Sequence, residues 1–129
     1  MIRMDHVMFR TPDIDKSVLF YETVFGMQVD SIDDHPSDNY KLVFMLEKNS
    51  GIKLEITYNY GVDIQEESGR AFGHVGFYVD NAIEMCDKSM LMGYHARYHR
   101  HKSSVGNSYI IGVIMSPEGL EIAVVEKLS

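Results

Sequence analysis

Apolar and polar positions in the first half of the chain predict one strand, one helix and three further strands. Residues 4–9 are mostly apolar and precede a Thr-Pro-Asp break, as is typical of a short strand. From Ile14 the apolar residues approach helical spacing, with Asp13 placed to cap the helix and Gly26 to end it. We therefore predict a helix over residues 13–25, followed by strands over residues 27–32, 40–47 and 52–58.

The same order of elements returns in the second half, after the polar segment 61–69. Residues 73–79 predict a strand, and Asp80 and Asn81 precede a helix that runs to Met92. Residues 94–98, 108–115 and 120–125 predict three more strands. The pattern indicates an α+β fold of two tandem βαβββ modules, residues 1–60 and 70–129, within a single domain of residues 1–129.

One histidine and one glutamate occupy matching positions in both modules. His6 and His74 lie 68 residues apart in the first strand of each module, and Glu55 and Glu121 lie 66 apart in the last strand. A single histidine in an apolar strand is most often a core residue, but a carboxylate on an inward face needs a partner or a cation. Repetition of the pair favours a metal site in a mixed sheet.

Two imidazoles and two carboxylates are a donor set that suits a borderline divalent ion such as Ni²⁺, Zn²⁺, Co²⁺ or Fe²⁺. The two carboxylates cancel the charge of the ion, and four protein ligands leave positions free for substrate oxygens in an octahedral shell. Such an open site is typical of catalysis rather than of a structural metal.

Composition narrows the class of protein. The formal charge of −7 argues against a nucleic-acid partner, because phosphate binding depends on lysine and arginine. No apolar run reaches the roughly 18 to 20 residues of a membrane span. Cys86 is the single cysteine and the first residues do not resemble a signal peptide, so we expect a cytoplasmic protein. The basic residues 97–102, including His99 and His101, are expected to form a solvated loop.

Four segments of the chain resemble glyoxalase I of the vicinal oxygen chelate superfamily. They are DHVMFR (5–10), LEITYNYGVD (54–63), GHVG (73–76) and PEGLEI (117–122). The second is the most specific and is similar to the short, bacterial-type enzymes. The resemblance implies the glyoxalase/bleomycin-resistance/dioxygenase fold. Its metal ligands map onto His6, Glu55, His74 and Glu121.

The resemblance also implies an activity, namely isomerisation of the hemithioacetal of methylglyoxal and glutathione to S-D-lactoylglutathione. Glu121 is then the expected base, with Glu55 as its counterpart on the opposite face of the substrate. Positions that hold the thiol in the family map onto Arg10, Asn59, Arg70 and Lys102. The resemblance further implies Ni²⁺, with Co²⁺ or Zn²⁺ as alternatives, and a homodimer with its sites at the subunit interface.

Other members of the superfamily leave alternatives open. They include enzymes like methylmalonyl-CoA epimerase, thiol transferases, ring-cleaving dioxygenases and binders without enzymatic activity. The NYGVD sequence favours the glyoxalase branch, and the complete set of four ligands argues against a simple binder. Residues 94–102 depart from the family pattern because they are rich in histidine and arginine. The identity of the thiol is therefore open.

Overall fold

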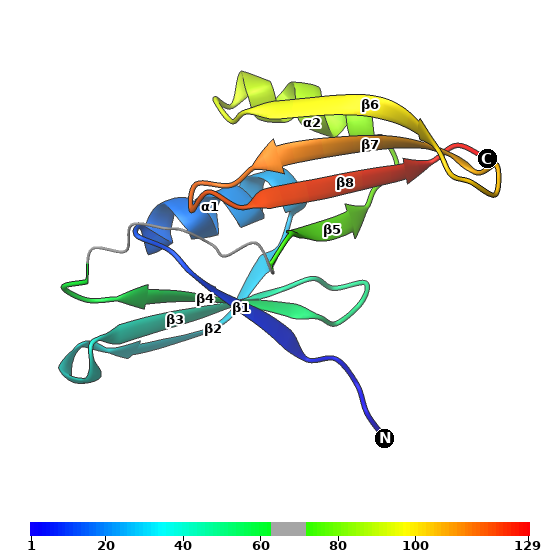
Figure 1. Cartoon of the computed structure of the whole chain (residues 1–129). Coiled ribbons are helices and arrows are strands. Elements are labelled where there is room, and N and C mark those ends of the chain that lie inside the picture. The colour runs from blue at the N-terminus through cyan, green and yellow to red at the C-terminus, as the bar shows by residue number, and fades with distance from the viewer. Residues whose placement is uncertain (63–71) are drawn as a thin grey trace. The chain divides into compact units, whose positions relative to one another are not determined.

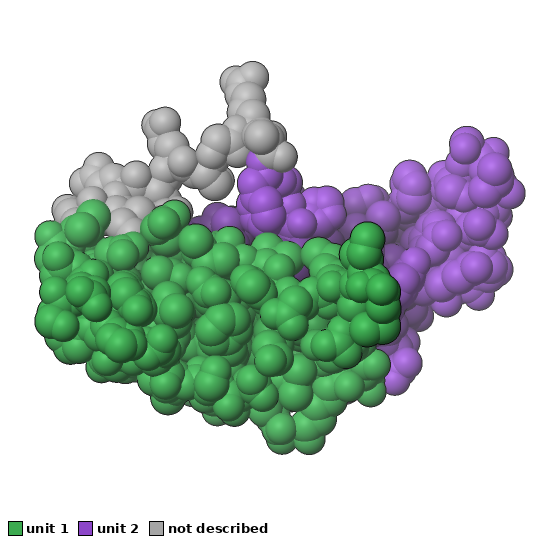
Figure 2. Space-filling view, turned by 90° about the horizontal axis from the view of Figure 1, so that it is seen from below, with its two compact units in different colours: residues 1–66 green, residues 67–129 purple. Residues whose placement is uncertain are grey.

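The computed structural model describes residues 1–62 and 72–129 of the chain. It divides into two compact units, Met1–Glu66 and Glu67–Ser129, which are coloured separately in Figure 2. Unit 1 contains β1 (His6–Arg10), α1 (Ile14–Phe25), β2 (Gln28–His35), the short 3-10 helix η1 (Pro36–Asp38), β3 (Tyr40–Leu46) and β4 (Lys53–Asn59). Unit 2 contains β5 (His74–Tyr78), α2 (Ala82–Leu91), β6 (Ala96–Lys102), β7 (Ser108–Met115) and β8 (Glu121–Lys127). The predicted α+β fold with a βαβββ order in both halves is confirmed.

Both units contain a four-stranded mixed sheet of the same topology (Figure 1). In unit 1 the strand order is β1-β4-β3-β2, with β1 parallel to β4 and the other neighbours antiparallel. In unit 2 the order is β5-β8-β7-β6, with β5 parallel to β8. The first strand of each unit therefore lies beside its last strand, which brings the two ends of the unit's sequence together.

Helix α1 covers one face of the unit 1 sheet. Its N-terminus is capped by the Asp13 side chain, which accepts a hydrogen bond from the Lys16 amide, and it ends at Gly26 with φ 63°. Phe20 and Tyr21 are fully buried between the helix and the apolar residues of the sheet. Aromatic side chains thus fill the space under α1 and leave the other face of the sheet without a covering helix from its own unit.

Helix α2 covers the corresponding face of unit 2 with smaller side chains. Asn81 caps its N-terminus, and Cys86 is fully buried against β7. A Cβ atom added at Gly112 in β7 would lie 2.5 Å from Cys86 Sγ and 2.8 Å from Val124 Cγ2. The glycine therefore lets the helix approach the sheet more closely than any larger residue would.

The segment expected to be a solvated loop is a strand, so that prediction is wrong. Strand β6 continues to Lys102 and pairs antiparallel with β7, from Ala96 beside Ile114 to Lys102 beside Ser108. It lies at the edge of its sheet and is exposed along most of its length, which permits a polar and basic sequence where a central strand would be apolar. No helix among the described residues has both the length and the apolar character to cross a membrane.

Candidate metal centre

In unit 1 the neighbouring strands β1 and β4 carry His6 and Glu55 on the same face, opposite α1. The parallel register pairs His6 with Lys53 and Met8 with Glu55, so the two side chains lie diagonally across the strand pair. His6 Nε2 lies 3.6 Å from Glu55 Oε1. This is too far for a hydrogen bond, but two ligands each about 2.0 to 2.2 Å from one ion, at an angle of about 90 to 120°, are separated by about 3 to 3.6 Å.

The other ring nitrogen of His6 is held by Asp5. His6 Nδ1 lies 2.8 Å from Asp5 Oδ2 and donates to it, since an ionised carboxylate only accepts hydrogen bonds. This hydrogen bond lowers the pKa of the Asp5 carboxyl below its usual value. The His6 and Phe44 rings also form a T-shaped pair, with 5.7 Å between ring centroids. With Nδ1 protonated, the lone pair of Nε2 is available on the side of Glu55, as in histidines that bind metals.

Glu55 is the more sheltered of the two candidate glutamates. Its side chain is 17% exposed, and the Thr57 hydroxyl donates to Oε2 at 3.4 Å. Oε1 is the oxygen that approaches His6. The carboxylate is therefore held in one orientation by its own strand and points one oxygen at the imidazole.

Unit 2 places the second pair on its own sheet. His74 and Glu121 are direct register partners in the parallel strands β5 and β8, so their side chains share a face. His74 is preceded by Gly73, which offers no carboxylate comparable to Asp5. Glu121 is 47% exposed, and its Oε1 lies 3.6 Å from Nη2 of Arg97 in β6.

The donor chemistry fits a divalent ion, but one unit alone does not supply a full set of ligands. Each unit provides one imidazole and one carboxylate, which together suit a borderline metal. Within residues 1–62 and 72–129, no group of three or more histidine, cysteine, aspartate or glutamate side chains is close enough to hold an ion. Each unit therefore presents one histidine and one glutamate on a face of its own sheet.

Of the residues predicted to hold the thiol, Arg10 and Asn59 are brought together. Arg10 Nε donates to Asn59 Oδ1 at 3.2 Å, at the end of the same sheet face that carries Glu55. Arg70 lies outside the described residues. Lys102 pairs with Ser108, which places it on the α2 side of its sheet, whereas His101 pairs with Tyr109 on the side of Glu121.

Sequence reasoning missed three polar or charged residues that contact the candidate ligands: Asp5, Thr57 and Arg97. Asp5 and Thr57 are close in sequence to the ligands, so a search for acidic or hydroxyl neighbours could have found them. Arg97 could not be found in this way, because only the register of β6 on β7 and β8 shows which of its residues share the Glu121 face.

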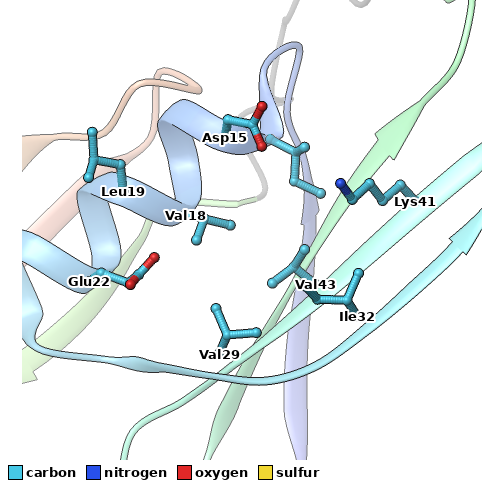
Figure 3. Close-up of a pocket in the computed structure, with 9 residues that line it drawn as sticks. Asp15, Val18, Leu19, Glu22, Val29, Ile32, Lys41 and Val43 are labelled. Carbon is cyan, nitrogen blue, oxygen red and sulfur yellow. The ribbon is translucent and has the colours of Figure 1, made fainter.

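A separate groove lies on the other face of the unit 1 sheet. Figure 3 shows it between α1 and strands β2 and β3. Its volume is about 390 Å³. Val18, Leu19, Val29, Ile32 and Val43 give it an apolar lining, with Asp15, Glu22 and Lys41 also contributing. Side chains alternate between the two faces of β3, and Val43 pairs with Ile56 while Phe44 pairs with Glu55. The groove therefore lies on the face of the sheet opposite Glu55. It therefore contains none of the candidate ligands.

A family model and the sequences of known proteins match this chain over nearly its whole length. The model of the Glyoxalase/Bleomycin resistance protein/Dioxygenase superfamily matches residues 3–124. The chain is 34% identical to a lactoylglutathione lyase of Escherichia coli O157:H7 over 130 residues, covering 98% of this chain and 93% of that protein. It is 33% identical to a lactoylglutathione lyase of Haemophilus influenzae, covering 96% and 92%.

Solved structures agree with this comparison. The trypanothione-dependent glyoxalase I of Leishmania major is 30% identical, with a TM-score of 0.80 over 98% of this chain and 87% of that one. Glyoxalase I from Zea mays is 27% identical, with a TM-score of 0.83, and this chain spans only 47% of its length. Since sequence, fold and family model agree, the chain belongs to the Glyoxalase/Bleomycin resistance protein/Dioxygenase superfamily.

Proposed function

We propose that this chain is a metal-dependent lactoylglutathione lyase. It converts the hemithioacetal of methylglyoxal and glutathione into S-D-lactoylglutathione. The observation that carries the proposal is the 34% identity to a lactoylglutathione lyase over nearly the full length of both proteins. The histidine and glutamate pair present in each unit supports it, because isomerisation at a carbon beside a carbonyl needs both a base and an electrophile.

The proposed ligands of the ion are His6, Glu55, His74 and Glu121. The Asp5 hydrogen bond supports the assignment of His6, and the approach of Glu55 Oε1 to His6 Nε2 supports a shared ion in unit 1. Ni²⁺ is the preferred metal in this proposal, with Co²⁺ and Zn²⁺ as alternatives. Mixed nitrogen and oxygen donors suit each of these ions.

We further propose a homodimer in which unit 1 of one chain and unit 2 of its partner complete each site. Two ligands on an open sheet face are too few for a catalytic divalent ion, which ordinarily has at least three protein ligands. A two-fold dimer would form two equivalent sites from four such faces. The two ligands per unit are the support for this arrangement.

Each proposed ligand also has a role in the chemistry. A bound divalent ion supplies electrostatic stabilisation of the charge that develops on the substrate's vicinal oxygens. Glu121 removes the proton from the carbon beside the carbonyl and later returns it to the neighbouring carbon. Glu55, sheltered beside Thr57, lies opposite the base and stays in its binding position.

The thiol is proposed to be held at its charged end by Arg10 and Asn59. Their side chains already form one hydrogen-bonded unit, and a guanidinium with free N–H groups binds a carboxylate well. Arg70 and Lys102 stay predictions for the same role. A buried free thiol at Cys86 accords with a reducing compartment, so the proposed location is the cytoplasm.

The decisive assay uses purified protein stripped of metal and reloaded separately with Ni²⁺, Co²⁺ and Zn²⁺. Methylglyoxal is offered with glutathione and with other thiols, and thioester formation is followed by absorbance. We expect glutathione to support turnover, with Ni²⁺ the best activator, and Glu121→Gln to abolish most of it. Absence of thioester with every thiol and every metal would contradict the proposed function.

A further inference from the structure

Strand β6 presents a basic row on the face of unit 2 that carries Glu121. In the register of β6 on β7, Arg97, His99 and His101 pair with Val113, Ile111 and Tyr109. Val113 in turn pairs with Ala123, and Met115 pairs with Glu121, so these positions all share one side of the sheet. Figure 1 shows β6 at the edge of this sheet, next to β7.

Arg97 reaches across β7 from this row to the candidate base. Its Nη2 atom lies 3.6 Å from Glu121 Oε1, although its backbone is two strands away. Both side chains are well exposed, Arg97 at 66% and Glu121 at 47%. The pair is therefore a contact between solvent-exposed charged groups, and the carboxylate can exchange the guanidinium for another cation at little cost.

Glu55 has no comparable contact in unit 1. The cation nearest to it in sequence is Lys53, whose Nζ lies 3.2 Å from Asp30 Oδ2. Among the described residues, no lysine or arginine forms an ion pair with Glu55, whose contacts are Thr57 and His6. The two glutamates thus differ in their neighbours: Glu121 lies beside the Arg97 guanidinium, whereas Glu55 forms no ion pair with a lysine or arginine among the described residues.

We propose that Arg97 is a positioning residue that gives the Glu121 carboxylate a partner away from the ion. The inference rests on the proposed function and deepens it by naming what makes Glu121, rather than Glu55, the ligand that moves. A carboxylate that leaves a cation must be stabilised elsewhere, and a guanidinium does so with charge-assisted hydrogen bonds.

Arg97 assists a proton transfer from the substrate to Glu121. The C–H bond beside the carbonyl breaks, and the proton forms an O–H bond on the displaced carboxylate of Glu121. The electron pair of the broken bond moves into a carbon–carbon double bond as the carbonyl oxygen becomes negative. The protonated Glu121 then gives its proton to the neighbouring carbon, while the hydroxyl proton on the first carbon's oxygen moves to the negative oxygen of the former carbonyl. The products are a thioester carbonyl, a new hydroxyl group and an ionised Glu121, which again has Arg97 beside it.

The test compares Arg97→Met with Arg97→Lys and with Arg100→Met as the matched control. Arg97→Met removes the charge and keeps an apolar stem. Arg100 lies on the same strand and pairs with Ile110 on the opposite face, so its loss should leave the site unchanged. Two quantities are measured for each protein: the nickel dissociation constant without substrate, by competition with a chelator, and kcat at saturating nickel.

Opposite changes in the two quantities are expected for Arg97→Met. Loss of the competing cation should tighten nickel binding by about two- to fivefold, as befits an exposed pair. At the same time kcat should fall by about tenfold, with a larger isotope effect from methylglyoxal deuterated at the aldehyde carbon, because base catalysis is impaired. In Arg97→Lys, the nickel dissociation constant and kcat should both lie closer to the wild-type values. In Arg100→Met, both should equal them.

Two results would overturn the proposal. One is an unchanged kcat in Arg97→Met, and the other is a parallel loss of nickel affinity and kcat, which indicates a structural role only. Failure of the proposed function is a separate result, since in that case the wild-type protein loaded with nickel would itself form no thioester from methylglyoxal and glutathione.

Discussion

The two units repeat one topology but surround their candidate ligands differently. In unit 1, His6 is oriented by Asp5, and Glu55 is sheltered with a hydroxyl on one oxygen. In unit 2, His74 follows a glycine, and Glu121 is nearly half exposed beside an arginine. Two copies of one module can therefore keep the same donor atoms and still surround them with different side chains. In the proposed site, unit 1 would hold the ion and unit 2 would supply the ligand that moves.

The outer edge strands of the units differ in charge as well. Strand β2 of unit 1 carries Asp30, Asp33 and Asp34, whereas β6 of unit 2 carries Arg97, Arg100 and Lys102. Both strands lie at a sheet edge and are largely exposed, where charge protects against unwanted strand pairing. The protective function is shared, but only the basic strand extends a side chain to a candidate ligand.

Separate replacement of the two glutamates by glutamine should give the largest difference between the units. Glu121→Gln is expected to lower kcat by about 10² to 10⁴, because the proton acceptor is lost. Glu55→Gln should lower kcat less when nickel is saturating, since it removes a ligand but leaves the base. Steady-state kinetics across a nickel titration measures both variants. A larger loss of kcat in Glu55→Gln would reverse the assigned roles.

Removal of the Asp5 carboxylate should weaken nickel binding by unit 1, because His6 loses the group that orients it. Asp5→Ala is expected to loosen nickel binding by about 10- to 100-fold, the usual effect of losing a carboxylate that orients a metal-binding histidine. Asp15→Ala, in an exposed position on α1, is the control and should bind nickel like the wild type. Chelator competition gives both constants. Equal affinity in Asp5→Ala and the control would show that His6 needs no such support.

The packing of α2 through small residues predicts a difference in stability. Gly112→Ala should lower the free energy of unfolding by about 1 to 3 kcal/mol, because its methyl group would overlap Cys86 Sγ and Val124 Cγ2. Gly76→Ala in β5 is the control, since the nearest atom to its added Cβ is 4.0 Å away. Urea unfolding measures both. If the two variants are equally stable, α2 is not held as closely as the structure indicates.

An aspartate placed before His74 should make the units more alike. Gly73→Asp meets no atom within 4 Å of its Cβ and needs no left-handed backbone, so the fold should accept it. We expect nickel binding to tighten by about two- to threefold, a fraction of what an evolved orienting carboxylate contributes. Gly73→Ala controls for the backbone change. Unchanged affinity in Gly73→Asp would mean that the position before the histidine does not determine the difference between units.

Much of this arrangement follows from the sequence, for identifiable reasons. The repeat is visible because a histidine and a glutamate occur at nearly the same spacing in both halves, as His6 with Glu55 and His74 with Glu121. The start of the first helix is predictable because Asp13 has the side chain of a helix cap. Strand β6 was missed beyond Tyr98 because an exposed edge strand has no apolar alternation. The side of the sheet on which Lys102 lies, and the reach of Arg97, depend on register, which long-range pairing decides rather than local sequence.

In the proposed homodimer, each site takes one ligand pair from unit 1 of one chain and the other from unit 2 of its partner. Complementation between inactive chains tests this directly. A chain with His6→Ala and a chain with His74→Ala are co-expressed, and the activity of the mixture is compared with that of each variant alone. The control mixture combines His6→Ala with Glu55→Gln, in which both changes lie in unit 1.

We expect His6→Ala and His74→Ala each to be inactive alone and their mixture to recover about a quarter of the wild-type activity. Random pairing makes half of the dimers mixed, and each mixed dimer holds one complete site of its two. The control mixture should show no activity beyond that of its two variants measured alone, because no pairing restores an intact unit 1. Absence of recovery in the first mixture, with mixed dimers shown to form, would contradict a site shared between chains.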